Sequence, residues 1–194
     1  MQETMAANIK LYVARCFELY NWPMDDRLAI LYARRSIRKY RPGNLPDDTI
    51  TELCQAAMAA PSAHNRQPWQ LLVITDQTAR EQLSHAHPHA KFAADASAVF
   101  IVFGEPIGEL IDHDLAAVTE NLLVAAAGLG LGACWCGVTD ERRPAIHGTT
   151  GIPAHMRIVS MVTVGYPAEQ KEPRTQYNPD KVHWEKYGGW QQAF

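Results

Sequence analysis

The sequence lacks several features that would point to a specialised class of protein. No apolar run approaches the roughly 18 residues that a membrane-spanning helix requires. Lys10 and Arg15 interrupt the apolar pattern near the N-terminus, so we expect no signal peptide there. The formal net charge is only −3, which gives no basic surface for nucleic acid. We therefore expect a soluble protein that has neither a membrane nor nucleic acid as a partner.

Cysteine is scarce too, with 4 residues in a chain of 194. So few thiols, together with the expected lack of a signal peptide, favour reduced cysteines and a cytoplasmic location. Cys134 and Cys136 form a CxC pair, but no second pair is present to complete a zinc site. Cys16 and Cys54 lie on predicted helix faces, where a cysteine packs as a small apolar side chain. We expect no metal site.

What the sequence does contain is the composition of one globular domain, 47% hydrophobic and 20% charged. Helical spacing predicts helices at 5–20, from Asp25 to near Ser36, and from 111 to 129, where the glycines of GLGLG end the helix. A further helix would have a core face of Ile50, Leu53, Cys54, Ala57 and Met58. Apolar runs predict strands at 70–75, 96–104, 133–138 and 157–167. Since helices and strands mix without strict alternation, we expect an α+β or layered α/β/α domain around a mixed sheet.

The stretch RRSIRKY, residues 34–40, concentrates positive charge. Arg34, Arg35 and Arg38 lie close together in it, and Ser36 adds a hydroxyl group. Arginine suits phosphate because its planar fork makes paired, charge-assisted hydrogen bonds. A solvated basic turn would look the same, so charge clustering alone leaves both interpretations open.

The stretch APSAHNRQPWQLLVIT, residues 60–75, gathers small polar side chains just before a predicted strand. Asn65 and Gln67 each carry hydrogen-bond donors and acceptors, so they could match the polar edge of a heterocycle. The alternative is loop capping, in which Asn65 satisfies backbone groups of a turn. Taken alone, the stretch does not decide between these two roles.

Histidines alternate around Pro88 in the tract HAHPHA, at His85, His87 and His89. Such tracts sometimes bind metal, but we interpret this one as an exposed polar loop. The glycines of GLGLG do not follow a strand and open a helix, so they are no dinucleotide fingerprint. Neither motif predicts a catalytic centre.

Four motifs in this order resemble the flavin-dependent nitroreductase family: ARRSIRKY, LCQAAMAAPSAHNRQPWQLLVIT, AAGLGLGACWCGV and IPAHMRIVSMVTVGYPAEQKEPR. The resemblance covers residues 28–187. It implies an α/β/α sandwich with a mixed, mainly antiparallel central sheet that binds FMN non-covalently. It also implies a homodimer with FMN at the interface and an exchanged C-terminal tail, in which Trp184, Tyr187 and Trp190 pack on the partner. The chain would divide into an N-terminal helical extension, 1–27, and an FMN-binding domain, 28–194.

The resemblance also implies which residues hold FMN. The phosphate and ribityl chain would lie among Arg34, Arg35, Ser36, Arg38 and Arg174. Asn65 and Gln67 would bond the pyrimidine side of the ring, and the partner subunit would line it with Pro61, Ser62 and Ala63. The flavin N5 would lie near the backbone of Trp135, Cys136 and Gly137, with an N–H rather than a thiol making the contact. No catalytic side chain is expected, since redox chemistry belongs to the cofactor.

The activity that the resemblance implies is an FMN-dependent NAD(P)H oxidoreductase. It would pass two electrons, by ping-pong hydride chemistry, to nitroaromatic, quinone or similar small-molecule acceptors. The sequence does not choose between NADH and NADPH. An FMN-binding protein with a storage, sensing or specialised flavin role is one alternative. A metal-binding protein that uses the histidines and the CxC pair is another.

Overall fold

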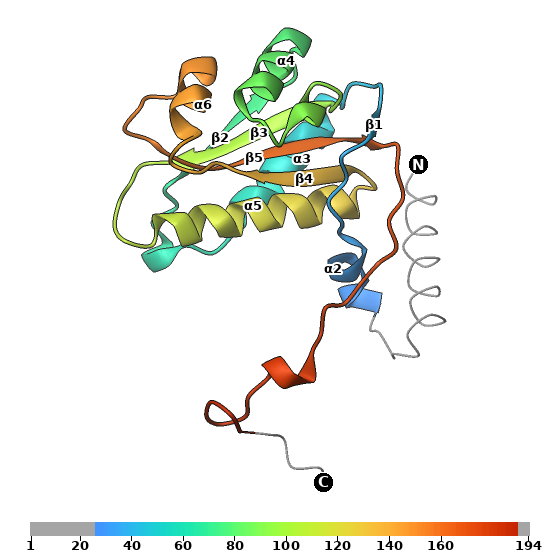
Figure 1. Cartoon of the computed structure of the whole chain (residues 1–194), viewed down its shortest axis with the longest axis vertical. Helices are drawn as coiled ribbons and strands as arrows, with labels where there is room; N and C mark the ends of the chain where they lie inside the picture. The colour runs from blue at the N-terminus through green and yellow to red at the C-terminus, as the bar shows by residue number, and fades with distance from the viewer. Residues whose placement is uncertain (1–25, 190–194) are drawn as a thin grey trace.

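Residues 26–189 are described by the computed structural model, and they form a five-stranded sheet with helices on both faces (Figure 1). The strands are β1 (Tyr40–Arg41), β2 (Trp69–Ile74), β3 (Ala98–Gly104), β4 (Gly132–Gly137) and β5 (Arg157–Pro167). The helices are α2 (Ala29–Ala33), α3 (Asp47–Met58), α4 (Gln77–Ala86), α5 (Ile111–Gly128) and α6 (Arg143–Thr150). Short 3-10 turns, η1 to η4, lie at Asp26–Leu28, Ala63–Asn65, Lys91–Ala93 and Pro179–Lys181. The helix predicted at 5–20, with Cys16, and Trp190 lie outside the described residues.

The strand β5 is the centre of the sheet. It pairs with β3 along one side and with β4 along the other, and its C-terminal end pairs with β1. The strand β2 completes the sheet on the far side of β3. All of these pairings are antiparallel, while one parallel bridge joins Ser36 to Ala133 of β4. The mixed, mainly antiparallel sheet that the resemblance implied is confirmed.

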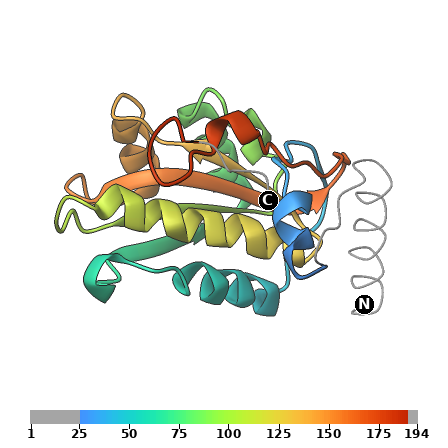
Figure 2. The same ribbon diagram turned by 90° about the horizontal axis from the view of Figure 1, so that it is seen from below.

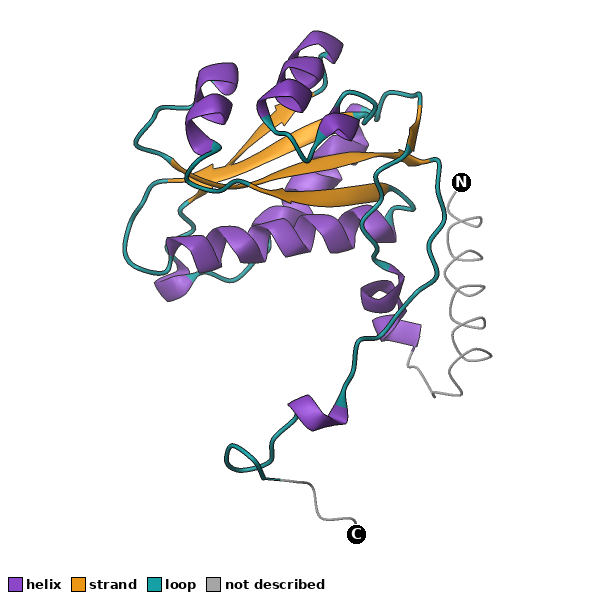
Figure 3. Cartoon of the chain, in the orientation of Figure 1, coloured by secondary structure: helices purple, strands orange, loops and turns teal. Residues whose placement is uncertain are grey.

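The central strands are buried on both faces, so their apolar residues pack alternately against two helical layers. On one face Phe100 and Val102 of β3 pack with residues of α3 and α5. On the other face Val99 and Ile101 pack with residues of α4 and α6. Figure 2 shows α3 and α5 side by side, and Figure 3 shows helices on both sides of the strands. The α/β/α sandwich is therefore confirmed.

The long elements follow the sequence prediction closely. The helix α5 ends at Gly128, and Gly130 beyond it has a φ of 70°, which is the left-handed conformation that glycine tolerates. The strand β5 has the predicted bounds, 157–167. Among the described residues, no helix is long and apolar enough to cross a membrane.

The helix predicted to run to near Ser36 ends earlier, at Ala33, so that prediction was wrong at its C-terminal end. Arg34 is already extended, with φ −60° and ψ 118°. The residues that follow pair with β4, since Ile37 donates its N–H to the Ala133 carbonyl at 2.9 Å. This long-range pairing ends the helix, and local periodicity does not reveal it.

The predicted core face of α3 was right except at its end. Leu53 and Ala57 are fully buried, and Ile50 and Cys54 pack at the margin of the same core. Met58 is 46% exposed, because it is the last residue of the helix and the chain turns away there.

The histidine tract is only in part the exposed polar loop that we expected. His89 is exposed and lies outside any helix, but His85 belongs to the helix α4. The first turn of α4 is capped by the Asp76 carboxylate, which accepts from Ala79 N–H at 2.9 Å. His87 ends this helix and is only 1% exposed. Aspartate just before the helical run was the signal that the sequence prediction overlooked.

The C-terminal tail leaves the body of the molecule after β5 (Figures 1 and 3). It first passes α2, where Arg174 donates its backbone N–H to Tyr32 O at 3.2 Å. Beyond that point Tyr177, Trp184 and Tyr187 are 59%, 43% and 91% exposed. Large aromatic side chains of a monomeric protein are rarely so exposed to water.

We predict that Gly104→Ala destabilises the fold. A Cβ at this position would lie 2.3 Å from the Pro68 backbone oxygen and 3.3 Å from Leu115 Cδ2, so β3 and the chain entering β2 would have to separate. We expect a loss of about 1–3 kcal/mol in the free energy of unfolding, measured by urea denaturation. Gly148→Ala is the matched control, because it lies within α6 with no atom within 4 Å of its Cβ position and should change stability little or raise it. Equal stabilities for the two variants would contradict the close packing at Gly104.

Candidate functional site

Residues 34–38, the basic segment, lie against the first half of β4. The bridge between Ser36 and Ala133 and the hydrogen bond from Ile37 N–H to Ala133 O hold the segment there. The approach is close, because a Cβ on Gly132 would lie 2.6 Å from Ile37 Cγ2. Glycine at 132 therefore permits the contact that fixes the basic segment in place.

An extended backbone sends alternate side chains to the same side, so Ser36 and Arg38 lie on one side of the segment. Ser36 and Arg38 are both near Cys134. The backbone N–H of Arg38 donates to Glu169 Oε1 at 2.6 Å, and this bond lowers the pKa of the Glu169 carboxyl. The basic segment is therefore bonded on one side to β4 and on the other to the chain that follows β5.

Lys171 is a further cation at this place, and the sequence prediction missed it. Its Nζ donates to the Ser36 carbonyl and lies 3.3 Å from Glu169 Oε1. The signal available in the sequence was its position in QKEPR, just before the predicted Arg174. The chain after β5 thus brings a second source of positive charge to the basic segment.

The other predicted phosphate-binding residues lie around α2. Arg34 Nε is 3.4 Å from a carboxylate oxygen of Glu120 on α5. Arg35 donates from Nη1 to the Glu172 carbonyl. The backbone bond from Arg174 to Tyr32 brings the late arginine to the same helix. The structure therefore gathers the early and the late basic residues in one part of the molecule.

Cys134 and Cys136 lie on one face of β4 and are buried among the residues that pack under α4 and α6. A hydrogen bond from Cys136, with the positive charges of Arg38 and Lys171, lowers the pKa of Cys134 to about 7 although burial opposes this. The hydrogen bond to Cys134 and burial raise the pKa of Cys136. Both thiols point into the core, as predicted for packing residues. Within residues 26–189 no three His, Cys, Asp or Glu side chains are grouped so that they could hold a metal ion.

The backbone of β4 beyond Ala133 forms an open edge of the sheet. Ala133 O faces away from β5 to accept from Ile37, and alternate residues of a strand direct their backbone groups to the same side. Trp135 and Gly137 therefore also direct their N–H and C=O groups outward, and we call these groups the open edge of β4. A Cβ at Gly137 would meet no atom within 4 Å. The open edge offers backbone hydrogen-bond donors, whereas the Cys136 thiol lies in the core.

Residues 61–67, the amide loop, are held in an unusual backbone conformation. His64, Asn65 and Gln67 have φ values of 54°, 54° and 49°, in the left-handed region that costs a non-glycine residue free energy. Internal bonds maintain it, since Gln67 donates its backbone N–H to Ser62 Oγ at 3.0 Å and its side chain to Asn65 Oδ1 at 2.8 Å. Ala63 N–H also donates to Asp114 Oδ1 at 2.9 Å, at the start of α5. The loop therefore presents the exposed amides of Asn65 and Gln67 in a fixed arrangement, with Pro61 exposed beside them.

The amide loop and the open edge of β4 lie on opposite sides of the molecule. The amide loop leads into β2, and β2 is separated from β4 by β3 and β5. Three strand spacings amount to about 14 Å, and the open edge faces away from β2. Figure 1 shows this separation across the sheet. The predicted site residues therefore form two groups in one chain, which do not meet.

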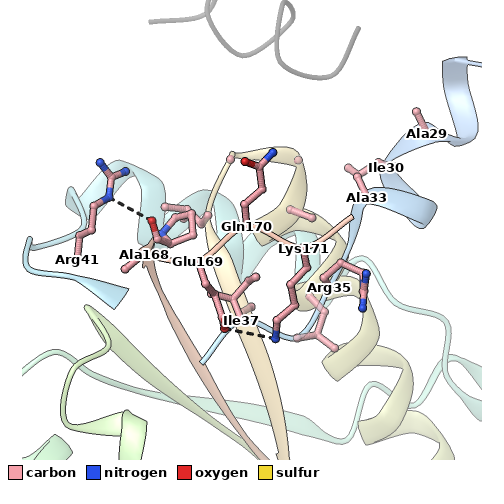
Figure 4. Close-up of a pocket in the computed structure, with 17 residues that line it drawn as sticks. Ala29, Ile30, Ala33, Arg35, Ile37, Arg41, Ala168, Glu169, Gln170 and Lys171 are labelled. Carbon is pink, nitrogen blue, oxygen red and sulfur yellow. Dashed lines mark hydrogen bonds and ion pairs between the residues drawn. The ribbon is translucent and has the colours of Figure 1, made fainter. Parts of the chain in front are cut away.

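A separate hollow of about 580 Å³ lies between α2, the end of α5 and residues 167–171 (Figure 4). Its walls include Ile30, Ile37 and Leu123, and Arg35 and Lys171 lie at its polar side. Arg35 is the one predicted site residue among those that line it. The hollow thus meets the basic segment at Arg35 and Ile37, and its Lys171 and Glu169 bond the backbone of Ser36 and Arg38.

Comparison with known proteins identifies the family to which the chain belongs. The sequence matches the Nitroreductase family over residues 31–102 and 85–166. It is 37% identical over 174 residues to the "Putative NADH dehydrogenase/NAD(P)H nitroreductase" of Archaeoglobus fulgidus, which covers 84% of this chain and 100% of that protein. A crystal structure of a protein of the same name from Bacteroides thetaiotaomicron superposes with a TM-score of 0.81 at 28% identity, over 84% of this chain and 99% of that one.

A third relative, from Desulfovibrio desulfuricans, was solved in complex with FMN. It superposes with a TM-score of 0.68 at 27% identity, over 80% of this chain and 93% of that one. The match to the family extends over most of the chain, and whole relatives are covered almost from end to end. On these grounds, the chain belongs to the Nitroreductase family.

Proposed function

We propose that this protein is an FMN-dependent NAD(P)H oxidoreductase that reduces nitroaromatic, quinone or similar small-molecule acceptors. The family, the nitroreductase relatives and the FMN complex of the Desulfovibrio protein support an oxidoreductase. The observation that carries the proposal is the open edge of β4, a row of backbone donors with the cations Arg38 and Lys171 near its strand. Such a site suits a flat, anionic cofactor.

The described residues fit the chemistry of FMN. A phosphate group requires fixed cations. The Arg34 side chain is held by Glu120, that of Lys171 by the Ser36 carbonyl, and the backbone of Arg38 by Glu169. We assign Arg35, Ser36 and Arg174 to the same phosphate and ribityl region. The amides of Asn65 and Gln67 carry the donors and acceptors that a pyrimidine ring requires, and Pro61, Ser62 and Ala63 would line the ring.

When bound, FMN supplies the redox chemistry, since it takes a hydride from NADH or NADPH and passes two electrons to the acceptor in a second half-reaction. The residues of the chain would bind FMN and orient it. We assign the backbone of Trp135, Cys136 and Gly137 to the N5 side of the ring, with the outward N–H of Trp135 or Gly137 as the fixed donor that stabilises developing negative charge. No side chain is assigned as a general acid or base. An open binding face of mainly apolar and backbone groups suits acceptors of varied shape.

The two separated groups of site residues support a homodimer. In a two-fold pair each copy would supply its basic segment and open edge to one site, and its amide loop to the other. The exposed Tyr177, Trp184 and Tyr187 support a tail that packs on the partner. We propose residues 28–194 as the FMN-binding domain and 1–27 as an extension to it.

The central test is whether the protein carries and uses FMN. We expect the purified protein to be yellow, and its flavin absorbance to be bleached by NADH or NADPH without oxygen and restored by a quinone or nitroaromatic. Bound FMN without turnover would instead indicate a flavin-binding protein with another role. A protein that remains colourless after incubation with FMN would exclude the proposal.

We predict that Arg38→Ala weakens FMN binding, since it removes a charge-assisted contact to the phosphate or ribityl region. The expected loss is about 1.5–3 kcal/mol, which is about 10- to 150-fold in the dissociation constant. Fluorescence titration of apoprotein with FMN measures it. Arg41→Ala is the control, because Arg41 lies on β1 and bonds Pro167 O at 3.1 Å outside the proposed site. The same dissociation constant for both variants would remove Arg38 from the site.

We predict that two variants with weakened FMN binding restore tight binding and activity when they are combined. In a shared site, a dimer of one Arg38→Ala copy and one Asn65→Ala copy has one intact site and one doubly altered site. About half of the sites are then intact in the purified mixed dimer. Co-expression with two affinity tags, followed by turnover assays of the mixed dimer, measures this. Mixed dimers no more active than either variant would mean that one chain supplies both groups.

A further inference from the structure

We propose that His87 is a positioning residue for the open edge of β4, an inference that rests on the proposed function. Its Nε2 lies 3.0 Å from the Gly137 carbonyl oxygen, 50 residues further along the chain. A carbonyl oxygen only accepts, so Nε2 carries the hydrogen and donates it. The bond joins the C-terminal end of α4 to the last residue of β4.

The peptide unit between Gly137 and Val138 is held from both ends. The Gly137 carbonyl accepts from His87, and the Val138 N–H donates to Val159 O at 2.9 Å. Glycine has more backbone freedom than any other residue, and no atom lies within 4 Å of the Cβ position at 137. No side-chain packing restrains this residue, so its conformation depends on backbone bonds. Pairing with Ser160 of β5 sets its register, and the bond from His87 adds a restraint on its carbonyl, at the end of the strand that carries the N–H groups of the open edge.

His87 is itself a rigid donor. Its backbone N–H donates to Leu83 O at 3.0 Å, and its carbonyl accepts from Ala90 N–H at 2.9 Å. The side chain is 1% exposed, and its ring meets the His89 ring edge-on at 6.3 Å between centroids. Donors that stabilise developing charge must be fixed before the reaction, and small misplacements cost rate.

The second ring nitrogen of His87, Nδ1, indicates that this residue does more than fill space in the core. Nδ1 is buried and has no hydrogen-bond partner within the described chain. A buried polar atom without a partner costs free energy, which an apolar side chain of similar size would avoid. The gain that offsets this cost is the bond from Nε2 to Gly137.

His147 provides a matched control on α6. Its Nδ1 lies 2.9 Å from the Ile152 carbonyl oxygen, and its Nε2 is buried without a partner. It therefore repeats the chemistry of His87, one ring nitrogen on a carbonyl and the other unsatisfied. Its bond closes the loop after α6 and does not involve the open edge of β4.

The experiment compares His87→Leu, His87→Gln and His147→Leu in the FMN-bound protein. One readout is the rate constant of anaerobic flavin reduction by NADH or NADPH. The second is amide hydrogen exchange at Trp135 and Gly137, followed by NMR, which needs no turnover. We expect His87→Leu to slow flavin reduction about 10- to 100-fold and to speed exchange at both amides. His87→Gln, whose amide Nε2 can donate to the same carbonyl, should stay near wild type, and His147→Leu should change neither readout.

Equal rate constants and equal exchange in His87→Leu and His147→Leu would overturn the inference while leaving the proposed function intact. If His87→Leu does not fold, His87→Gln is compared with His87→Asn, whose shorter amide does not reach Gly137. Slower reduction and faster exchange in His87→Asn alone support the inference, and identical values overturn it. A wild-type protein that binds no FMN would defeat the proposed function instead, and the exchange measurement would still decide whether His87 holds the edge.

Discussion

The short contact between residues 35–37 and the start of β4 governs the rest of the candidate site. It depends on one hydrogen bond, from Ile37 N–H to Ala133 O, and on glycine at 132, where a side chain would collide with Ile37. The contact ends α2 and holds the basic segment extended. It also stops at Ala133, so no strand of the described residues pairs with the outward N–H groups of Trp135 and Gly137. This pairing thus positions the cations of the basic segment and leaves the N–H donors of the open edge of β4 available.

The amide loop, which is the other half of the candidate site, is held by a different set of interactions. The amide loop keeps three residues in left-handed conformations through its own side-chain bonds and through Asp114 of α5. Strained backbone of this kind persists only where the surroundings determine it, and it is concentrated at functional sites. The sheet separates this loop from the open edge of β4, and this separation supports the proposed homodimer. The exposed aromatic residues of the tail point to the same arrangement.

Much of the fold and of the candidate site could be predicted from the sequence because it depends on local patterns of residues. The strand β5 and the helix α5 follow from apolar runs and helical spacing, and the basic segment and amide loop follow from short motifs. The end of α2, the burial of His87 and the role of Lys171 could not be predicted. Each depends on contacts between residues far apart in the chain, such as Ser36 with Lys171 and His87 with Gly137. Periodicity carries no information on such pairs.

The division of the site residues between two sides of one chain has a consequence for behaviour in dilute solution. If the site is shared in the proposed homodimer, a separated copy would supply only one of the two groups to each FMN and would bind it weakly. Cofactor and partner would then stabilise each other's binding by mass action. Specific activity would fall with dilution below the dissociation constant of the pair, and added FMN would oppose that fall.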